Sequence, residues 1–596
     1  MKTFLKIFLF ILIGSPTLSC NNFLDINAPG ALGEQTLHTK EGAEALLIGA
    51  YSLLDGSPNN TQNGWSSMNN WIYGSVAADD AHKGTEYGNG PGIELIENYT
   101  ADGSTTNFLA KWEAVYEGVQ RANDVLRLLN DMPEGMLTDE EDSQIRAEAI
   151  FLRGVFHLEA AKLWKNVPYV DETIHFNAGN FNVPNEGPIW DKIAVDFSTA
   201  AEALTETKQD PGRANKWAAK SFLAKVLMFQ HRYDEARVLL TDIIENGVTS
   251  SGQKYQLVEN YFDNFNASIK NHSESVFAVQ MSVGDGANGQ NGNPADWLIG
   301  MYSGPSSCCG YFQPSFTMAN TFKTDPNTGL PLFDTYNNAD IVNDMGIESS
   351  QSFQPYQGTL DPRIDHTIGR RGIPYLDWGN HPGKDWIRQQ SCGGPYSQKK
   401  FTYFKASKET TSEGASSNYI ANNLVLIRYA DVLLWAAEAE VEVGSLAKAE
   451  QYVNLVRARA ANPDGWVKKY VDEADPSKGF SETPAANYLI SLYSGDFEAK
   501  GQNFARNAVR FERRLELGME GHRFFDLQRY DNGTGYMAEV LNKYIQHETT
   551  RPGYDYLYMN GAKFVQGKNE IFPIPQSQID ISYDGGEPKL VQNPGY

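Results

Sequence analysis

Residues 214–247, ANKWAAKSFLAKVLMFQHRYDEARVLLTDIIENG, show most clearly the helical pattern that recurs along this chain. Apolar side chains recur at steps of three and four in both halves of this stretch, which is the spacing of an amphipathic helix. A short polar turn separates the halves, and Gly247 ends the second one. The stretch therefore predicts two helices, over 214–230 and 233–246, that pair as a helix–turn–helix unit.

The same pattern returns further along the chain. Residues 423–441 are apolar almost all round, which predicts a deeply buried helix, and residues 445–460 predict its partner. The turn between them resembles the turn at 231–236, and a small Ala after a short polar turn is typical of tetratricopeptide (TPR) helix pairs. Further helices are predicted over 40–54, 107–130, 142–165 and 188–207.

Long loops dominate the middle of the chain. Residues 276–280 predict a strand, and another short strand is predicted over 569–575. Three loops rich in Gly, Asn, Pro and aromatic residues follow the first strand, at 283–315, 324–361 and 369–400. Loops of this length usually carry function. The sequence thus predicts a mostly α fold, with a TPR-like scaffold and a loop-rich second region that carries a few short strands.

Length and charge limit the functions open to this chain. Its 596 residues suffice for two or three units or for one large helical array. The formal net charge is −24, so nucleic acid, which needs a basic surface, is not an expected partner. The same charge would repel an anionic membrane, and attachment to a membrane must come from another feature.

The N-terminus supplies such a feature. Lys2 and Lys6 precede an apolar run that is too short to span a membrane, so residues 1–19 are interpreted as a secretory signal peptide. The following Ser19-Cys20 resembles a bacterial lipobox, in which the signal is cut before the Cys and the Cys is lipidated. The alternative is an ordinary signal peptide with a Cys at this place by chance.

Three further cysteines lie in the body of the chain. A bridge from Cys392 to Cys308 or Cys309 is one possibility in an exported protein, and three thiols in loops are the other. Their spacing fits no zinc site, and we expect no metal or cofactor. The acidic pair Asp79-Asp80 lacks the spacing of an EF-hand calcium loop, so a capped loop turn is the preferred interpretation, and calcium binding stays open.

Aromatic residues in the loops are candidates for sugar binding, because flat rings suit the C–H face of a sugar and polar groups suit its hydroxyls. Three groups of candidates lie at Trp65, Trp71, Tyr73, Lys83, Tyr87 and Tyr99; at Asp296, Trp297, Tyr302, Tyr311 and Phe312; and at Tyr375, Asp377, Trp378, Trp386 and Arg388. The neighbours of Trp71 and Tyr73 favour core packing for these two. Trp378 and Trp386 fit a ligand, a partner or loop packing equally well.

Catalytic signals are weak. Glu512, Glu516 and Glu520 form a row on one helix face, among Arg513, Arg514, Arg523, Asp526 and Arg529. Glutamates four apart repel each other unless cations meet them, so a structural ion-pair network is predicted rather than paired carboxylates of a glycosidase. The chain contains no metalloprotease motif and no Gly-x-Ser-x-Gly elbow. An enzyme is therefore not expected, and no catalytic residue is assigned.

Several of these segments together resemble the SusD/RagB family of surface lipoproteins of Bacteroidota. Two segments are close to diagnostic of that family: ERRLEL at 512–517 through EGHRFFDL at 520–527, and the end, with FPIPQ at 572–576 and QNPGY at 592–596. The other matching segments, in order along the chain, are residues 20–25, 147–154, 218–226, 233–236, 361–363, 427–434, 437–439 and 454–459.

The resemblance implies four TPR-like helix pairs, a SusD-like N-terminal region over 20–250 and a RagB/SusD C-terminal region over 275–596 with ligand-binding loops. It implies an outer-membrane lipoprotein, exposed at the cell surface, that passes a nutrient to a SusC-like TonB-dependent transporter. The nutrient implied is an oligosaccharide. The loops that bind ligand in the family favour Tyr87, Tyr99, Trp297, Tyr302 and Tyr311 here.

Three other functions also fit the sequence. The same uptake role with a peptide cargo is one, and a TPR-type adaptor that binds only proteins is another. A secreted glycosidase on a helical scaffold would need two carboxylates that converge in an aromatic cleft. The sequence leaves open which ligand is bound and the stoichiometry with the transporter.

Overall fold

The computed structural model describes residues 37–56, 63–287, 289, 291–292, 301–306, 308–414, 419–551 and 559–596. The predicted signal peptide, Cys20 and Trp297 lie outside these residues. Within the described part, no helix is both long enough and apolar enough to cross a membrane.

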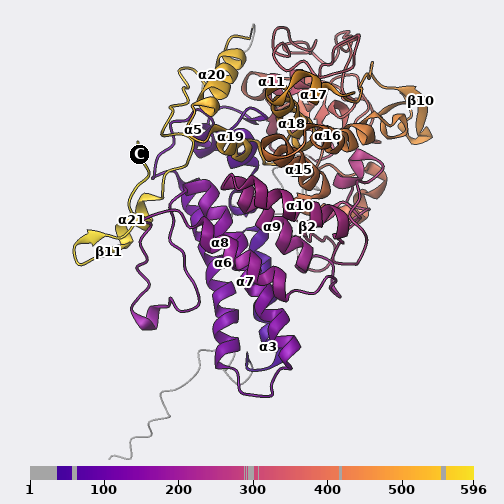
Figure 1. Cartoon of the computed structure of the whole chain (residues 1–596). Coiled ribbons are helices and arrows are strands. Elements are labelled where there is room, and N and C mark those ends of the chain that lie inside the picture. Colours follow the sequence, from indigo (N-terminus) through magenta and orange to yellow (C-terminus); the bar gives the residue numbers. More distant parts are fainter. Residues whose placement is uncertain are drawn as a thin grey trace, which may run out of the picture.

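Helices from the first half of the chain stand side by side in the lower part of Figure 1. They are α3 (Lys40–Tyr51), α6 (Thr106–Asp131), α7 (Asp139–Trp164), α8 (Trp190–Ala203), α9 (Lys216–Phe229) and α10 (Tyr233–Asn246). Consecutive helices from α6 to α10 pack on each other, as the helix–turn–helix pattern predicts.

The longest helices show why these segments fold as they do. Thr138 caps α7: its hydroxyl accepts from the backbone N–H of Glu141 at 3.2 Å, and the Glu141 carboxylate accepts from the N–H of Thr138 at 2.9 Å. Helix α6 then packs closely on α7 through Gly118. A Cβ at this position would lie 2.4 Å from the ring of Phe156, so only glycine fits the crossing.

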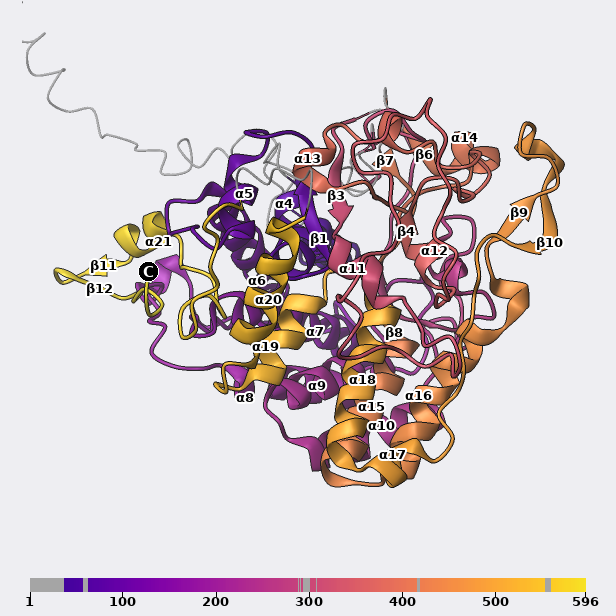
Figure 2. The ribbon, with the colours of Figure 1, turned by 90° about the horizontal axis from the view of Figure 1, so that it is seen from above.

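The second half of the chain adds helices above the first set and on its flank (Figures 1 and 2). They are α15 (Tyr429–Val443), α16 (Leu446–Ala461), α17 (Asp496–Lys500), α18 (Gln502–Leu517), α19 (Arg523–Asp531), α20 (Tyr536–Thr549) and α21 (Gln576–Ile581). Helix α15 packs on α10, α16 and α18 and so joins the two sets. A continuous apolar core runs from Ala43 to Leu590.

The strands are short and pair in twos, all antiparallel. The pairs are β1 (Ala81–Gly84) with β3 (Tyr311–Pro314), β2 (Ser275–Val279) with β8 (Leu424–Arg428), β4 (Ile368–Gly369) with β5 (Ser397–Gln398), β6 (Ser412–Glu413) with β7 (Tyr419–Ile420), β9 (Lys468–Tyr470) with β10 (Phe480–Pro484), and β11 (Tyr583–Asp584) with β12 (Glu587–Pro588). The predicted strand over 276–280 is therefore confirmed as β2.

One predicted helix begins later than expected, and one predicted strand is wrong. The helix expected over 423–441 begins only at Tyr429, because the apolar run before it forms β8, which pairs with β2 in the core. The strand expected over 569–575 is an extended segment outside any sheet. Its backbone bonds to the end of α7 instead: the N–H of Phe572 donates to Leu163 at 2.9 Å, and the indole of Trp164 donates to Pro573 at 3.0 Å.

Candidate ligand-binding site

Strands β1 and β3 bring together two loops that are more than two hundred residues apart in sequence. Gly84 pairs with Tyr311, and the N–H of Thr85 donates to the carbonyl of Gly310 at 2.5 Å just beyond the ladder. Gly84 and Gly310 both have positive φ, at 74° and 77°, which glycine adopts without strain. The chain can therefore turn away sharply on both sides of the ladder, toward the surface.

A third loop, after the short η7 helix (Lys384–Trp386), reaches the same place through Arg388. Its guanidinium forms an ion pair with Glu86, lies 3.5 Å from the hydroxyl oxygen of Thr85 and sits 5.9 Å from the ring centre of Tyr302. Arg388 thus connects the loops of all three candidate groups. We call Tyr87, Tyr302, Tyr311, Asn89 and the Glu86–Arg388 pair the tyrosine site.

Buried groups hold the floor of the tyrosine site. The Tyr311 hydroxyl donates to the side-chain oxygen of Asn89 at 2.7 Å, and the ring is only 4% exposed. Burial raises the pKa of Tyr311 to about 12, against the opposing charge of Arg388, so the phenol stays a neutral donor. Beneath it, the Lys83 ammonium pairs with Glu94 at 2.8 Å and donates to the backbone of Glu86 and Asn89, which fixes the 84–90 loop.

Two aromatic rings remain at the surface of the site. Tyr87 is 58% exposed and Tyr302 is 46% exposed. The ring of Tyr302 lies beside Arg388, and Tyr87 follows Glu86, the ion-pair partner of Arg388, in the sequence. Exposed rings beside fixed hydrogen-bonding groups form the kind of surface that a sugar ring can stack on. The arrangement offers contacts for binding.

Other predicted candidates lie elsewhere. Tyr99 is 8% exposed, donates to the carbonyl of Ala77 at 3.2 Å and packs its ring edge-on against Phe564. Trp378 donates its indole N–H to Tyr403 at 2.9 Å and packs in a separate aromatic cluster.

The structure also places Trp386 and the two residues that were predicted to lie in the core, Trp71 and Tyr73. Trp386 is half-buried, two residues before Arg388, with its ring against Tyr375 and His381. Trp71 and Tyr73, each 1% exposed in the π-helix η3 (Trp71–Val76), are core residues as predicted.

The residues of the site that sequence reasoning missed are Thr85, Glu86 and Asn89. They flank Tyr87 in a glycine-rich loop, and that position was the available signal.

The cysteine prediction is also corrected. The disulfide joins the neighbours Cys308 and Cys309, and Cys392 lies outside it, buried in α13 (Gln390–Gly393). Cys392 packs in a helix against β1 and β3, where its thiol is enclosed, and burial raises its pKa. The disulfide sits between Tyr302 and Gly310, in the loop that carries one of the two exposed rings.

Two protein-family models match this chain. The model of the SusD family matches residues 273–596, and a second model, described as starch-binding associating with outer membrane, matches residues 22–228. The chain belongs to the SusD family. SusD-like protein P25 of Formosa agariphila is 24% identical over 556 residues, which covers 88% of this chain and 89% of that protein. SusD-like protein P38 of the same organism is 22% identical over 556 residues, which covers 91% and 94% of the two chains.

Solved structures confirm the SusD fold. A laminarin-binding SusD-like protein aligns with a TM-score of 0.61 and 23% identity, over 94% of this chain and 100% of that one. Surface glycan-binding protein A from Bacteroides thetaiotaomicron, in complex with laminarihexaose, aligns with a TM-score of 0.62 and 20% identity, over 93% and 99% of the two chains. The mostly α, TPR-like architecture predicted from the sequence is therefore confirmed.

Glu512 and Glu516 lie on α18, and Glu520 lies in the turn after it, so the predicted row on one helix face is shorter than expected. The three glutamates form a structural network, as predicted, but their partners differ from those expected. Glu516 is fully buried and meets Arg428 at 2.5 Å, Arg363 at 3.0 Å and also Arg459. Glu512 and Glu520 are likewise held by arginines and a lysine from other segments. The expected arginines of the same region pair elsewhere, with Asp79, Asp431, Asp526 and Glu438.

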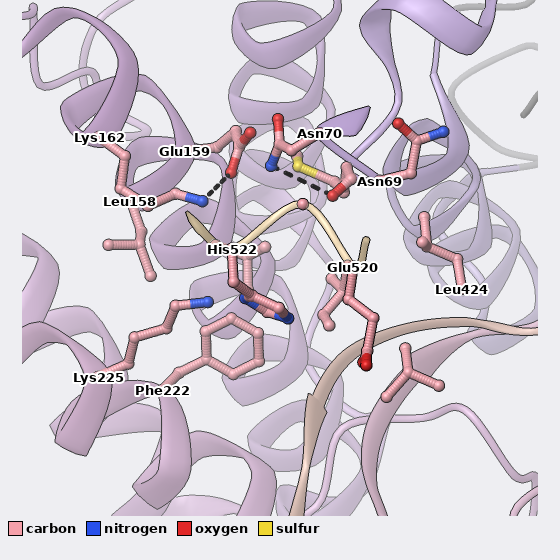
Figure 3. Close-up of a pocket in the computed structure, with 15 residues that line it drawn as sticks. Asn69, Asn70, Leu158, Glu159, Lys162, Phe222, Lys225, Leu424, Glu520 and His522 are labelled. Atoms are coloured by element: carbon pink, nitrogen blue, oxygen red, sulfur yellow. Dashed lines mark hydrogen bonds and ion pairs between the residues drawn. The ribbon is translucent and has the colours of Figure 1, made fainter. Parts of the chain in front are cut away.

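A small polar cavity between α7, α9, β8 and the turn after α18 is a second place to consider (Figure 3). Lys225 lies beside His522 there, and Lys162 pairs with Glu159 at 2.7 Å. Burial and the charge of Lys162 lower the pKa of Lys225 to about 8. The cavity measures about 40 Å³, enough for one or two water molecules but too small for a sugar ring. Within the described residues, no three His, Cys, Asp or Glu side chains gather as metal ligands would.

Proposed function

We propose that this SusD-family protein binds a glycan at the cell surface and delivers it to a SusC-like TonB-dependent transporter. In this proposal a lipid on Cys20 anchors the protein to the outer membrane. The observation that carries the proposal is the convergence of three distant loops on Arg388, which leaves the ring of Tyr302 exposed beside it. Tyr87, next to Glu86 in the sequence, is exposed as well. The names of the aligned laminarin-binding and laminarihexaose-bound structures support a glycan as the cargo.

Within this proposal the tyrosine site has a division of labour. Tyr87 and Tyr302 offer faces for stacking, while Arg388 and Asn89 offer polar groups for hydroxyls. Tyr311 fixes Asn89 from below. Trp297 stays in the proposal because it precedes Tyr302 in the same loop, and Trp386 borders the site through Arg388. Tyr99 and Trp378 are left out, since their rings are engaged in the packing described above.

We propose binding without turnover. The carboxylates that would serve a glycosidase, Glu512, Glu516 and Glu520, are each held in ion pairs with arginine or lysine and lie inside the scaffold. A carboxylate held by cations in this way is a poor general acid, because the cations favour its charged form.

Calorimetric titration of the full chain in detergent against laminarin oligosaccharides, other neutral glycans and peptides tests the proposal. Saturable glycan binding without product is expected, and Tyr87→Ala and Tyr302→Ala should each weaken it about 2- to 10-fold, the range of one aromatic contact. Tyr583→Ala is the matched control, because Tyr583 is 54% exposed on β11, away from the site. Binding of peptides alone would replace the cargo, and glycan binding that ignores both tyrosines would refute the site.

A further inference from the structure

A larger cavity, of about 380 Å³, opens among α18, α20, the segment at 333–337 and α11 (Phe316–Thr321). Figure 2 shows α11, α18, α19 and α20 grouped around this region. The cavity and the tyrosine site share no lining residue and lie at opposite ends of the β1–β3 ladder. Tyr311 is at the end of the ladder that faces the tyrosine site, and Ser315, bonded to the backbone of Asp79 and Asp80, is at the other end.

Three arginines and only one carboxylate form the inner wall of the cavity. Arg514 pairs with Asp79 at 2.8 Å, and Arg523 pairs with the same carboxylate at 2.7 Å. Arg510 lines the cavity beside them. Asp79 pairs with Arg514 and Arg523, and the buried carboxylate of Asp80 also faces the charges of these two arginines. Arg510 has no carboxylate partner in the described residues, so it supplies the uncompensated positive charge of the wall.

Arg510 offers hydrogen-bond donors that an anion could engage. Its guanidinium is 4.2 Å from the ring centre of Tyr530 and 5.5 Å from that of Tyr536, so stacking holds it in place. Its Nε is buried without an acceptor among the described residues, and the same is true of the Nε of Arg514, a residue only 5% exposed. Buried donors without acceptors are costly, and a bound anion would satisfy them.

The remaining lining explains what kind of anion fits. Phe333, Tyr336 and Phe511 give the cavity aromatic walls, and the Tyr336 hydroxyl lies 3.1 Å from the Nη1 of Arg514. The charges at the rim balance locally: Lys543 pairs with Glu539 at 2.6 Å. Asp334 is exposed, and His547 is held by Asp340 and Glu548.

We propose that this cavity binds an acidic saccharide, a sugar ring that carries a carboxylate, at a site separate from the tyrosine site. The guanidinium fork matches a carboxylate in plane, the aromatic walls match the C–H face of a sugar, and the volume lies in the range of small-molecule sites. The proposal does not rest on glycan binding at the tyrosine site.

The test is calorimetric titration of the full chain in detergent with galacturonate, galactose and acetate. Galacturonate should bind saturably, more weakly as NaCl is raised, and Arg510→Met should weaken it about 10-fold or more, as expected for a lost charge-assisted hydrogen bond. Arg510 is half-buried and forms no ion pair with any described residue, so the variant should fold, which circular dichroism checks. Tyr302→Ala is the control, and it should leave galacturonate binding unchanged.

Each other outcome contradicts the proposal. No binding of galacturonate, or binding that Arg510→Met leaves unchanged, shows that the cavity does not take this ligand. If acetate competes with galacturonate equally well, the cavity is an anion site without selectivity for sugars. If galactose binds as tightly as galacturonate, the arginines do not contribute to recognition. Because Tyr302 and Arg510 lie at different ends of the ladder, failure here leaves glycan binding at the tyrosine site as a separate question.

Discussion

Glu516→Gln removes one negative charge from the centre of the scaffold while it keeps the size of the side chain. In the native protein one carboxylate oxygen of Glu516 meets Arg428 at 2.5 Å and also Arg459, and the other meets Arg363 at 3.0 Å. An amide presents only one oxygen and turns an NH₂ group toward a guanidinium. The variant therefore leaves three buried cations with one fewer carboxylate between them.

The expected loss in the free energy of unfolding is about 3–5 kcal/mol, the range for removal of one partner from a buried ion pair. Helix propensity adds almost nothing, because Glu and Gln are nearly equal in a helix interior. A loss of this size is a large part of the stability of most domains, which is about 5–15 kcal/mol. The effect arises because Glu516 is fully buried and water cannot replace the lost charge.

Urea unfolding of the purified protein, followed by tryptophan fluorescence, measures the change through the midpoint at constant slope. Glu482→Gln is the control, since the pair of Glu482 with Lys468 is exposed and should contribute little.

Burial alone would raise the pKa of Glu516, but Arg459, Arg428 and Arg363 lower it well below its ordinary value. Its contribution is thus present above the unfolded pKa of about 4.3 and is lost as the pH falls further, so the two proteins should converge in acid. A loss under about 1 kcal/mol at pH 7 would refute the reasoning.

Two other predictions concern stability. Burial alone would lower the pKa of His82, but its two glutamate partners raise it to about 9, so its contribution is full below pH 6.5 and lost as the pH rises through 9. His82→Gln should remove about 3 kcal/mol of this pH dependence, and a variant that keeps the native slope in pH-dependent urea unfolding would contradict it. Gly74→Ala should destabilise by at least about 2–3 kcal/mol, since a Cβ there would lie 1.8 Å from the carbonyl oxygen of Gly521, whereas Gly49→Ala, in open space on α3, should stabilise slightly in the same assay.

The helical scaffold could be predicted because its signal is local. The period of apolar residues in 214–246 predicts both helices to within about two residues of α9 and α10, and no distant contact is needed. The segment at 424–428 shows where this approach ends. A short apolar run fits a buried helix and a buried strand equally well, and the choice is made by β2, about 150 residues earlier in the chain.

The tyrosine site could be predicted only in part, for the same reason. Residue type and loop position selected Tyr87, Tyr302 and Tyr311. The structure brings Tyr302 and Tyr311 to Arg388 and leaves Tyr87 exposed next to Glu86, the partner of that arginine. Tyr99 has the same residue type and a similar loop context, yet its hydroxyl bonds to Ala77 and its ring packs in the core. The difference depends on how the chain folds around each ring, which residue type does not reveal.

Segments that identify the family and the loops of the proposed tyrosine site are different parts of this chain, and the buried charges explain why. Asp361, Arg363, Arg428, Arg457 and Glu516 all lie in segments that resemble family motifs, and all are joined in one ion-pair network inside the scaffold. A buried ion pair tolerates few replacements, because removal of one partner leaves the other charge buried without a counter-charge and without water to solvate it. The loops around Arg388 face no such constraint, since their exposed rings can change without exposing a buried charge. The scaffold can therefore keep its motifs while the loops change the ligand, and for this reason the family is easier to predict from the sequence than the cargo.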